Sequence, residues 1–194
     1  MSIRYGLLAL LQREPMYGYQ LRTEFESSTG GTWPLNVGQV YTTLARLERD
    51  GSVAVRAGDG AQDADAPKTY AITARGQEEL AGWFATPVSR SQPPRDELAI
   101  KLAMAIAAPG VDVRSVIQAQ RTDTLRALQD YTRLKLRAQD SDLPWLLVLD
   151  SLIFGAEAEV RWLAHCEARL VRHRPLPSTE PAAVPARSES WARR

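Results

Sequence analysis

Residues 36–51, NVGQVYTTLARLERDG, predict one short helix with a defined start, a defined end and two unlike faces. Asn36 is a suitable N-cap, and Gln39, three residues later, completes a capping-box-like pair. Gly51 stands where a C-terminal cap belongs. At about 100° per residue, one side of this helix is apolar: Val40, Leu44 and Leu47.

The opposite side of this helix is small, hydrogen-bonding and cationic. It carries Gly38, Gln39, Thr42, Ala45, Arg46 and Arg49. Gln and Arg can each make bidentate contacts to base edges, and small residues allow close approach, so this face suits the major groove of DNA. Many ordinary solvated helices also carry Arg and Gln, so that alternative stays open at this point.

The neighbouring segments predict the order helix, helix, helix, strand, strand, helix. The predicted helices span 3–12, 17–28, 36–51 and 73–85, and the strands span 53–56 and 68–72. This is the order of a winged helix-turn-helix, in which the third helix contacts DNA and a two-stranded ribbon forms the wing. The loop 57–67 contains three Asp and no Lys or Arg, so we expect its tip to turn away from phosphate.

The rest of the chain predicts an all-α dimerisation domain, which makes the fold mainly α. Helices are expected at 96–107, 113–139 and 143–172. The first half of the last helix is apolar nearly all round and must be buried on more than one side, so we expect a second subunit to cover it. The candidate dimer contacts are Leu146, Leu149, Leu152 and Ile153.

Composition divides the chain into four parts. A winged helix-turn-helix domain is predicted over 1–86, a proline-containing linker over 87–95 and the helical dimerisation and effector domain over 96–172. Residues 173–194 contain four prolines and no apolar periodicity, and we expect a disordered tail.

The charge distribution excludes a bulk electrostatic attraction to nucleic acid. The 194-residue chain has a net charge of +1, and residues 1–86 contain eight Lys and Arg against ten Asp and Glu. DNA binding must therefore come from a local face. The net-acidic head also supports an alternative, a winged-helix module that binds a partner protein and makes no direct contact with DNA.

Several function classes have no support in the sequence. A single cysteine, Cys166, excludes an intrachain disulfide, and His165 and Cys166 lack the spacing of a metal site. Nucleophile–base arrangements and phosphate-binding Gly loops are not found. Residues 6–11, the longest N-terminal apolar run, are too short for a membrane span and lack a signal-peptide pattern. We expect a cytoplasmic protein that is not an enzyme and has no cofactor, metal or membrane partner.

Taken together, three segments resemble the PadR family of bacterial transcriptional regulators. They are Pro15 with residues 17–21 (YGYQL), residues 39–51 (QVYTTLARLERDG), and residues 68–73 (KTYAIT) with Gly76. Residues 93–172 also look like the helical C-terminal domain of the longer PadR members. The resemblance implies a homodimer joined through its C-terminal helices, usually a repressor. It also implies release from DNA by a small aromatic or hydrophobic effector.

The candidate contacts to double-stranded DNA divide into base and backbone contacts. Gln39 and Arg46 are the expected base readers, and Tyr41 resembles the family tyrosine that contacts the DNA backbone, although it could equally close the edge of the core. Of Tyr17 and Tyr19, one is expected in the core. The full candidate set is Gln39, Tyr41, Thr42, Thr43, Arg46, Arg49, Tyr19, Arg22, Arg56 and Lys68. A homodimer would place two such helices on a palindromic operator.

Five side chains are candidates for an effector pocket at the dimer interface: Trp145, Phe154, Trp162, Trp83 and Met104. Ligand pockets are lined mainly by apolar and aromatic side chains, which is the reason for choosing them. An aromatic stripe at helical spacing is more often simple packing, and that alternative stays open.

Overall fold

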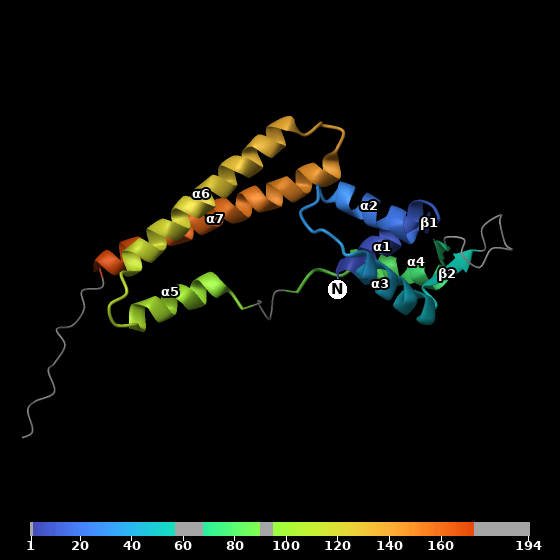
Figure 1. Cartoon of the computed structure of the whole chain (residues 1–194), viewed down its shortest axis with the longest axis horizontal. Helices are drawn as coiled ribbons and strands as arrows, with labels where there is room; N and C mark the ends of the chain where they lie inside the picture. The colour runs from blue at the N-terminus through green and yellow to red at the C-terminus, as the bar shows by residue number, and fades with distance from the viewer. Residues whose placement is uncertain (1, 57–67, 90–94, 173–194) are drawn as a thin grey trace, which may run out of the picture.

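The computed structural model describes residues 2–56, 68–89 and 95–172, which form an N-terminal unit and a helical domain side by side in an elongated molecule (Figure 1). The N-terminal unit contains α1 (Ser2–Arg13), β1 (Met16–Tyr17), α2 (Gly18–Ser28), α3 (Val37–Arg49), β2 (Val53–Arg56), β3 (Thr69–Ile72) and α4 (Ala74–Ala85). The helical domain contains α5 (Glu97–Ala107), α6 (Val113–Arg137) and α7 (Leu143–Arg172). The predicted mainly α fold with an N-terminal winged helix is confirmed.

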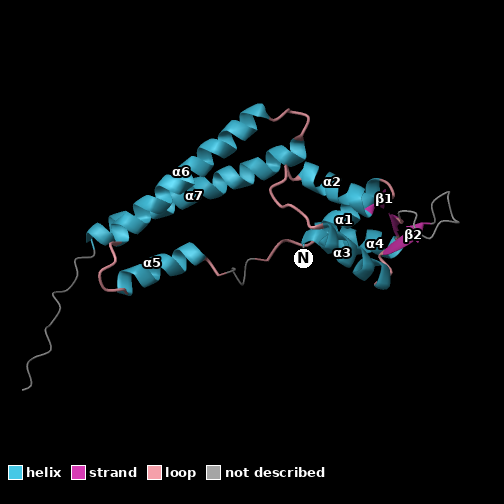
Figure 2. Ribbon diagram, in the orientation of Figure 1, coloured by secondary structure: helices cyan, strands magenta, loops and turns pink. Residues whose placement is uncertain are grey.

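The sheet has one more strand than the sequence predicts. Its order is β1-β3-β2, all antiparallel, with Met16 opposite Tyr70 and Val53 opposite Ile72 (Figure 2). Met16 is 1% exposed, so β1 joins β3 while placing this side chain in the core. The predicted second helix begins one residue late, at Gly18, because Tyr17 is extended and serves as its N-cap. The predicted wing tip, 57–67, and the predicted tail, 173–194, lie outside the described residues.

Helix α3 forms as its sequence predicts. Asn36 Oδ1 accepts a hydrogen bond from the Gly38 N–H at 2.8 Å, and Gln39 Oε1 accepts one from the Asn36 N–H at 3.2 Å. The chain leaves the helix through Gly51, whose φ of +74° suits a residue without a Cβ. Val40, Leu44 and Leu47 are each 0% exposed and fix α3 on the core.

The N-terminal core is built around α1, which contacts α2, α3, α4 and β3. The side chains that are almost completely buried in it are Leu7, Leu8, Leu11, Met16, Leu21, Val40, Leu44, Leu47, Val53 and Leu80. Burying a Leu side chain contributes about 1.5–3 kcal/mol relative to leaving it exposed, so this cluster is the main stabilising contact of the unit.

A polar network at the end of α3 joins three helices. The Arg4 guanidinium donates to Glu79 at 2.6 and 2.9 Å and to Asp50, the C-cap of α3, at 2.8 Å. Buried Ser52 donates to the same Glu79 carboxylate at 2.7 Å. The hydrogen bond from Arg4 lowers the pKa of Glu79, and Arg4 followed by Arg49 lowers the pKa of Asp50. The network therefore holds both carboxylates ionised and ties α3 to α1 and α4.

The helical domain is a long antiparallel hairpin of α6 and α7 with α5 beside one end (Figure 1). Ile117, Leu149 and Leu163 are almost completely buried in it. Polar pairs also join the two helices, among them Arg121 with Glu167 at 2.8 Å. The burial of Leu149 by its own chain corrects its prediction as a dimer contact.

The two parts meet where α2 ends and α7 begins. The Trp145 ring lies against Gly30, whose φ is +56°, and a Cβ atom at position 30 would overlap the ring. Gly31 has a similar φ of +68° but no atom near its Cβ position. Gly30 is therefore required both by its backbone conformation and by the close approach of Trp145.

These two glycines allow a test of the junction. We expect Gly30→Ala to lower the melting temperature more than Gly31→Ala, because each substitution incurs the left-handed backbone cost of about 1–2 kcal/mol and only the first displaces Trp145. Calorimetry of both variants measures the difference. Equal losses would show that the Trp145 contact adds no stability.

The polar network predicts a pH dependence of stability. Because the pKa of Glu79 is depressed in the folded state, its stabilising contribution is complete above the ordinary value of 4.5 and disappears as the pH falls through the lowered pKa. We expect Glu79→Gln to lower the free energy of unfolding at pH 7 by about 1–3 kcal/mol. The difference from the wild type should shrink towards pH 3 in urea titrations. Glu78→Gln, the exposed neighbour on α4, is the matched control and should change neither quantity.

Candidate nucleic-acid interface

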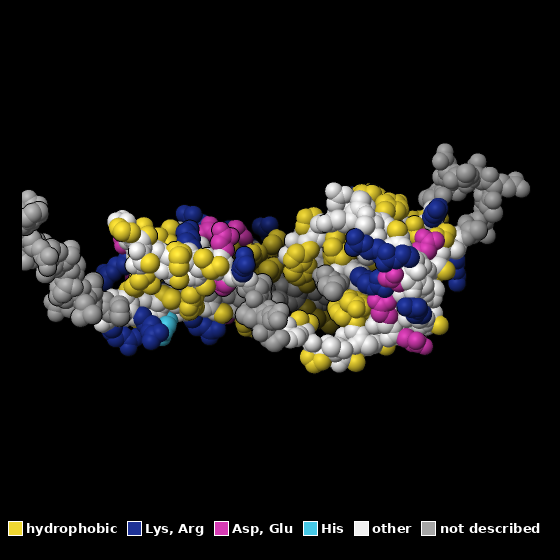
Figure 3. Space-filling view, turned by 90° about the horizontal axis from the view of Figure 1, so that it is seen from below, with side chains coloured by type: hydrophobic (Ala, Val, Ile, Leu, Met, Phe, Trp, Pro, Cys, Tyr) yellow, Lys and Arg dark blue, Asp and Glu magenta, His cyan; other side chains and the backbone are white. Residues whose placement is uncertain are grey.

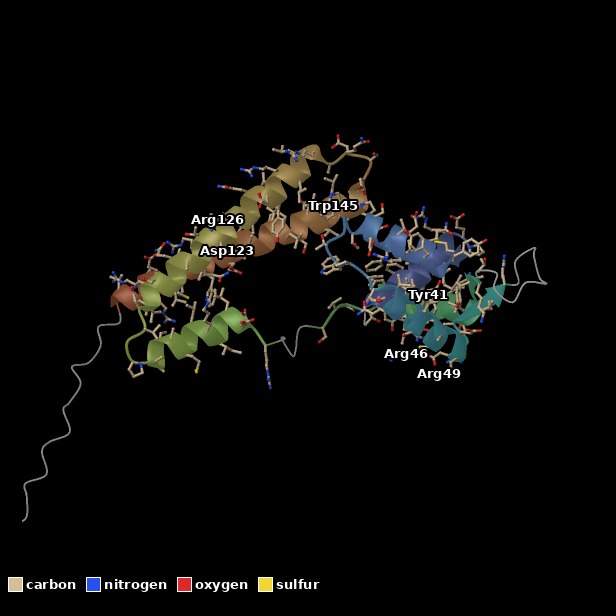
Figure 4. The ribbon with its side chains drawn as sticks, in the orientation of Figure 1. Tyr41, Arg46, Arg49, Asp123, Arg126 and Trp145 are labelled. Carbon is tan, nitrogen blue, oxygen red and sulfur yellow. The ribbon has the colours of Figure 1, made fainter. Side chains whose placement is uncertain are left out.

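The outer face of α3 is open to solvent along its whole length. Gln39, Thr42, Arg46 and Arg49 are all exposed, and Figure 4 shows Arg46 and Arg49 following one another along the helix. These side chains border a shallow groove of about 790 Å³, whose other wall includes Arg4 from α1. On the side of the N-terminal unit that holds α3, Lys and Arg side chains gather among acidic ones (Figure 3).

The two arginines of this face differ in their partners. Arg46 has no ion-pair or hydrogen-bond partner within the described part of the chain. Arg49 donates from Nε and Nη2 to Asp50 Oδ1, both at 3.1 Å. Its charge is partly neutralised by that carboxylate, which leaves Arg46 as the stronger candidate for an incoming acceptor.

The helix cap limits what Gln39 and Thr43 can do. The Gln39 carbonyl oxygen is used in the capping box, so its amide N–H groups remain to donate. The Thr43 hydroxyl donates to the Gln39 backbone oxygen at 2.7 Å and is half-buried. Gln39 therefore presents a donor outward, while the Thr43 hydroxyl proton is used within the helix.

Three tyrosines surround the contact between α2 and α3. Tyr41 is 46% exposed, and its ring lies so close to Gly18 that a Cβ there would be 2.8 Å away. Tyr17 is 45% and Tyr19 67% exposed, so the expectation that one of these two lies in the core is wrong. Met16 takes that place. All three rings are exposed, and that of Tyr41 lies beside Gly18 at the start of α2.

The remaining candidate cations differ in whether an acidic side chain pairs with them. Arg22 donates to Glu26 at 3.0 Å, and Glu26 also accepts from the Leu35 N–H. The Leu35 contact, followed by that of Arg22, lowers the pKa of Glu26, so Arg22 stays paired with an ionised group. Arg56 and Lys68 are exposed, at the end of β2 and just before β3. Arg56 and Lys68 are therefore accessible to a ligand, whereas the charge of Arg22 is partly neutralised by Glu26.

The five side chains predicted for an effector pocket do not come together. Trp83 belongs to the N-terminal unit and stacks on Tyr5, with ring centroids 5.0 Å apart. Trp145 occupies the junction with Gly30. Trp162 packs against the core of the helical domain, while Phe154 and Met104 are 66% and 60% exposed. Within the described residues of one chain these side chains do not line a common cavity, and a pocket between two subunits stays a prediction.

The exposed apolar surface of α7 differs from the predicted dimer contacts. Leu149 is 0% exposed, and Leu146, Leu152 and Ile153 are half-buried against the same chain. Leu143, Leu147 and Phe154 are instead 59%, 60% and 66% exposed. Their spacing of four and seven residues places them on one face of α7, next to the predicted contacts that stay partly exposed.

Metal binding and membrane insertion find no support in the described residues. Among the described residues, no group of three or more His, Cys, Asp or Glu side chains is arranged to hold a metal ion. Within the same ranges, no helix is both long and apolar enough to cross a membrane.

Comparison with known proteins covers both parts of the chain. Residues 7–82 match the transcriptional regulator PadR-like family, and residues 94–171 match the C-terminal family of virulence activator alpha. A probable transcriptional regulator of Mycobacterium tuberculosis is 28% identical over 181 residues, 84% of this chain and 94% of that protein. The negative transcriptional regulator PadR of Bacillus subtilis is 25% identical over 99 residues, 51% of this chain and 54% of that protein.

Solved structures share the fold. Bacillus subtilis PadR in complex with operator DNA superposes with a TM-score of 0.66 at 21% identity, covering 87% of this chain and 97% of that chain. The same protein in complex with p-coumaric acid gives 0.69 at 21% identity, covering 88% and 99%. The virulence activator AphA of Vibrio cholerae gives 0.63 at 20% identity, covering 89% and 99%.

Proposed function

We propose that this chain, whose residues 7–82 form a domain of the PadR-like family of transcriptional regulators, is a homodimeric repressor that binds a palindromic operator through α3. The family consists of transcriptional regulators and not of enzymes. The observation that carries the proposal is the exposed face of α3, where the Arg46 side chain has no acceptor among the described residues and Gln39 presents its amide donors. The relative crystallised with operator DNA supports the same mode of action.

In this proposal the base and backbone contacts come from different elements. Arg46 and Gln39 reach base edges in the major groove, where a guanidinium or an amide can make paired hydrogen bonds. Tyr41 and Tyr19 donate to phosphates beside α3, and Arg56 and Lys68 do so from the ends of the wing strands. Arg49 adds a weaker phosphate contact because it shares its charge with Asp50.

Repression and release by a ligand are further parts of the proposal. The Bacillus subtilis relative is a negative regulator and has been crystallised with p-coumaric acid, which supports a repressor that a small organic molecule releases. The contact between Trp145 and Gly30 gives a route, since a change in α7 would reach the end of α2 directly. A shift in the relative position of the two heads would then lower the affinity for DNA.

Arg46 provides the test of DNA recognition. We expect Arg46→Ala to weaken binding to the DNA upstream of the chain's own gene by about 1–3 kcal/mol and to relax sequence preference. Fluorescence anisotropy with that DNA and with a scrambled duplex measures both effects. Arg126→Ala is the matched control, because Arg126 is an exposed arginine on α6, far from α3 (Figure 4). Unchanged affinity and preference in Arg46→Ala would show that α3 is not the reader.

The same measurement at two salt concentrations separates the proposal from the alternative. A protein that contacts phosphates loses affinity linearly in the logarithm of the salt concentration. The absence of any binding at low salt would favour a module that binds a partner protein without contacting DNA.

The dimer proposal rests on the exposed side of α7. We expect Leu147→Lys to yield folded monomers, because Leu147 is 60% exposed within the chain and a charge there opposes burial by a partner. Leu149→Lys, two residues along, should unfold the hairpin instead, because Leu149 is 0% exposed. Light scattering gives the mass and circular dichroism the fold. A folded dimer of Leu147→Lys would place the interface elsewhere.

A further inference from the structure

A cup opens at the end of the helical domain that lies far from the N-terminal unit. Its volume is about 630 Å³, inside the range of about 300–1,000 Å³ that encloses organic ligands. Its wall is formed by Leu102 and Ile106 from α5, Val113 and Ile117 from α6, and Cys166 and Leu170 from α7. Leu102 and Ile117 are 5% and 1% exposed, so the floor of the cup is part of the domain core.

The rim of the cup is cationic. Arg169 and Arg172, from the last turn of α7, complete its lining, and Lys and Arg side chains gather at this end of the domain (Figure 3). Arg172 donates only its Nε, to the Ala168 carbonyl at 3.2 Å, and Arg169 has no ion-pair partner within the described ranges. The nearest acid along α7, Glu167, is held by Arg121 and Gln118. No carboxylate in the described part of the chain lines the cup, so its positive charge is uncompensated.

We propose that this cup binds a medium-chain carboxylic acid, with the apolar body against Leu102, Ile117 and Leu170 and the carboxylate at Arg169 and Arg172. An apolar floor under a guanidinium rim matches a molecule with one apolar and one anionic end, and Arg binds carboxylates through paired hydrogen bonds. A cationic or neutral ligand would leave this rim without a partner. The inference deepens the ligand-responsive part of the proposed function and rests on it for its regulatory meaning.

A cysteine in the wall of the cup allows ligand binding to be measured. Cys166 is the single cysteine of the chain and lines the cup, so the rate of its reaction with a thiol reagent measures occupancy. With dodecanoate at ten times its dissociation constant, we expect modification of the full-length protein to slow roughly tenfold. Methyl dodecanoate and dodecyltrimethylammonium, which lack the negative charge, should protect far less.

Matched variants locate the site. Ile106→Trp introduces a large ring at the cup from a position that is 62% exposed, so we expect it to abolish protection while the fold persists. Met104→Trp, 60% exposed on the same helix but outside the cup, should protect as the wild type does. Arg169→Gln and Arg172→Gln should each weaken the affinity for dodecanoate about tenfold, which leaves roughly twofold protection at the same concentration, since each removes a charge-assisted hydrogen bond. Arg161→Gln, outside the cup on α7, is their control.

Three outcomes would overturn the inference. Equal protection by dodecanoate and its methyl ester would show an apolar site without anion recognition. Protection that survives Ile106→Trp would place the ligand elsewhere. A second copy of the chain would fill the cup if two results came together. Cys166 would resist the reagent even without dodecanoate, and the molecular mass of the protein in solution would change in Ile106→Trp. Thiol protection needs no DNA, so failure of this site and failure of operator binding are separate results.

Discussion

The Arg4 guanidinium holds together three helices that are distant in the sequence, and the orientation of α3 depends on it. It binds Asp50 at the end of α3 and Glu79 on α4 from the first turns of α1. Hydrogen bonds between charged groups are stronger than neutral ones, and here they fix the end of a helix whose other side is anchored by leucines. The exposed face of α3 is therefore presented by a rigid support, which a surface that recognises base edges requires.

The parts of this fold that sequence predicts well are those with local signals. The capping box at Asn36, the glycine at 51 and the apolar stripe all lie within one short segment, and α3 forms as predicted. Strand β1 was missed because two residues carry no periodicity, and its pairing with β3 crosses more than fifty residues. Arg4 contacts Asp50 and Glu79, which lie 46 and 75 positions further along the chain, and no local sequence pattern predicts such contacts.

Residue type alone does not show the environment of an aromatic side chain in this fold. Of the aromatic side chains expected at an effector pocket between subunits, Trp83 packs on the N-terminal core and Trp145 lies at the junction within one chain. The cup that the structure contains is aliphatic and has an arginine rim. Leu149 and Leu147 are alike in sequence, but only the packing of α6 on α7 decides which of them is covered by its own chain. A helix that is apolar on all sides is expected to be buried on more than one side. The sequence does not show which side is covered by the same chain and which by another molecule.

Helix α7 is continuous for 30 residues, from the junction at Trp145 to the arginines at the rim of the cup. Because it is long, a small rotation about one end displaces the other end by several ångströms. At 1.5 Å per residue it spans about 45 Å, close to the full length of the helical domain. A tilt of about 5° about one end moves the other by about 4 Å, slightly more than the roughly 3.4 Å rise between neighbouring base pairs. If α3 binds DNA as proposed, a tilt of this size in α7 would displace the end that contacts α2 by about one base-pair step.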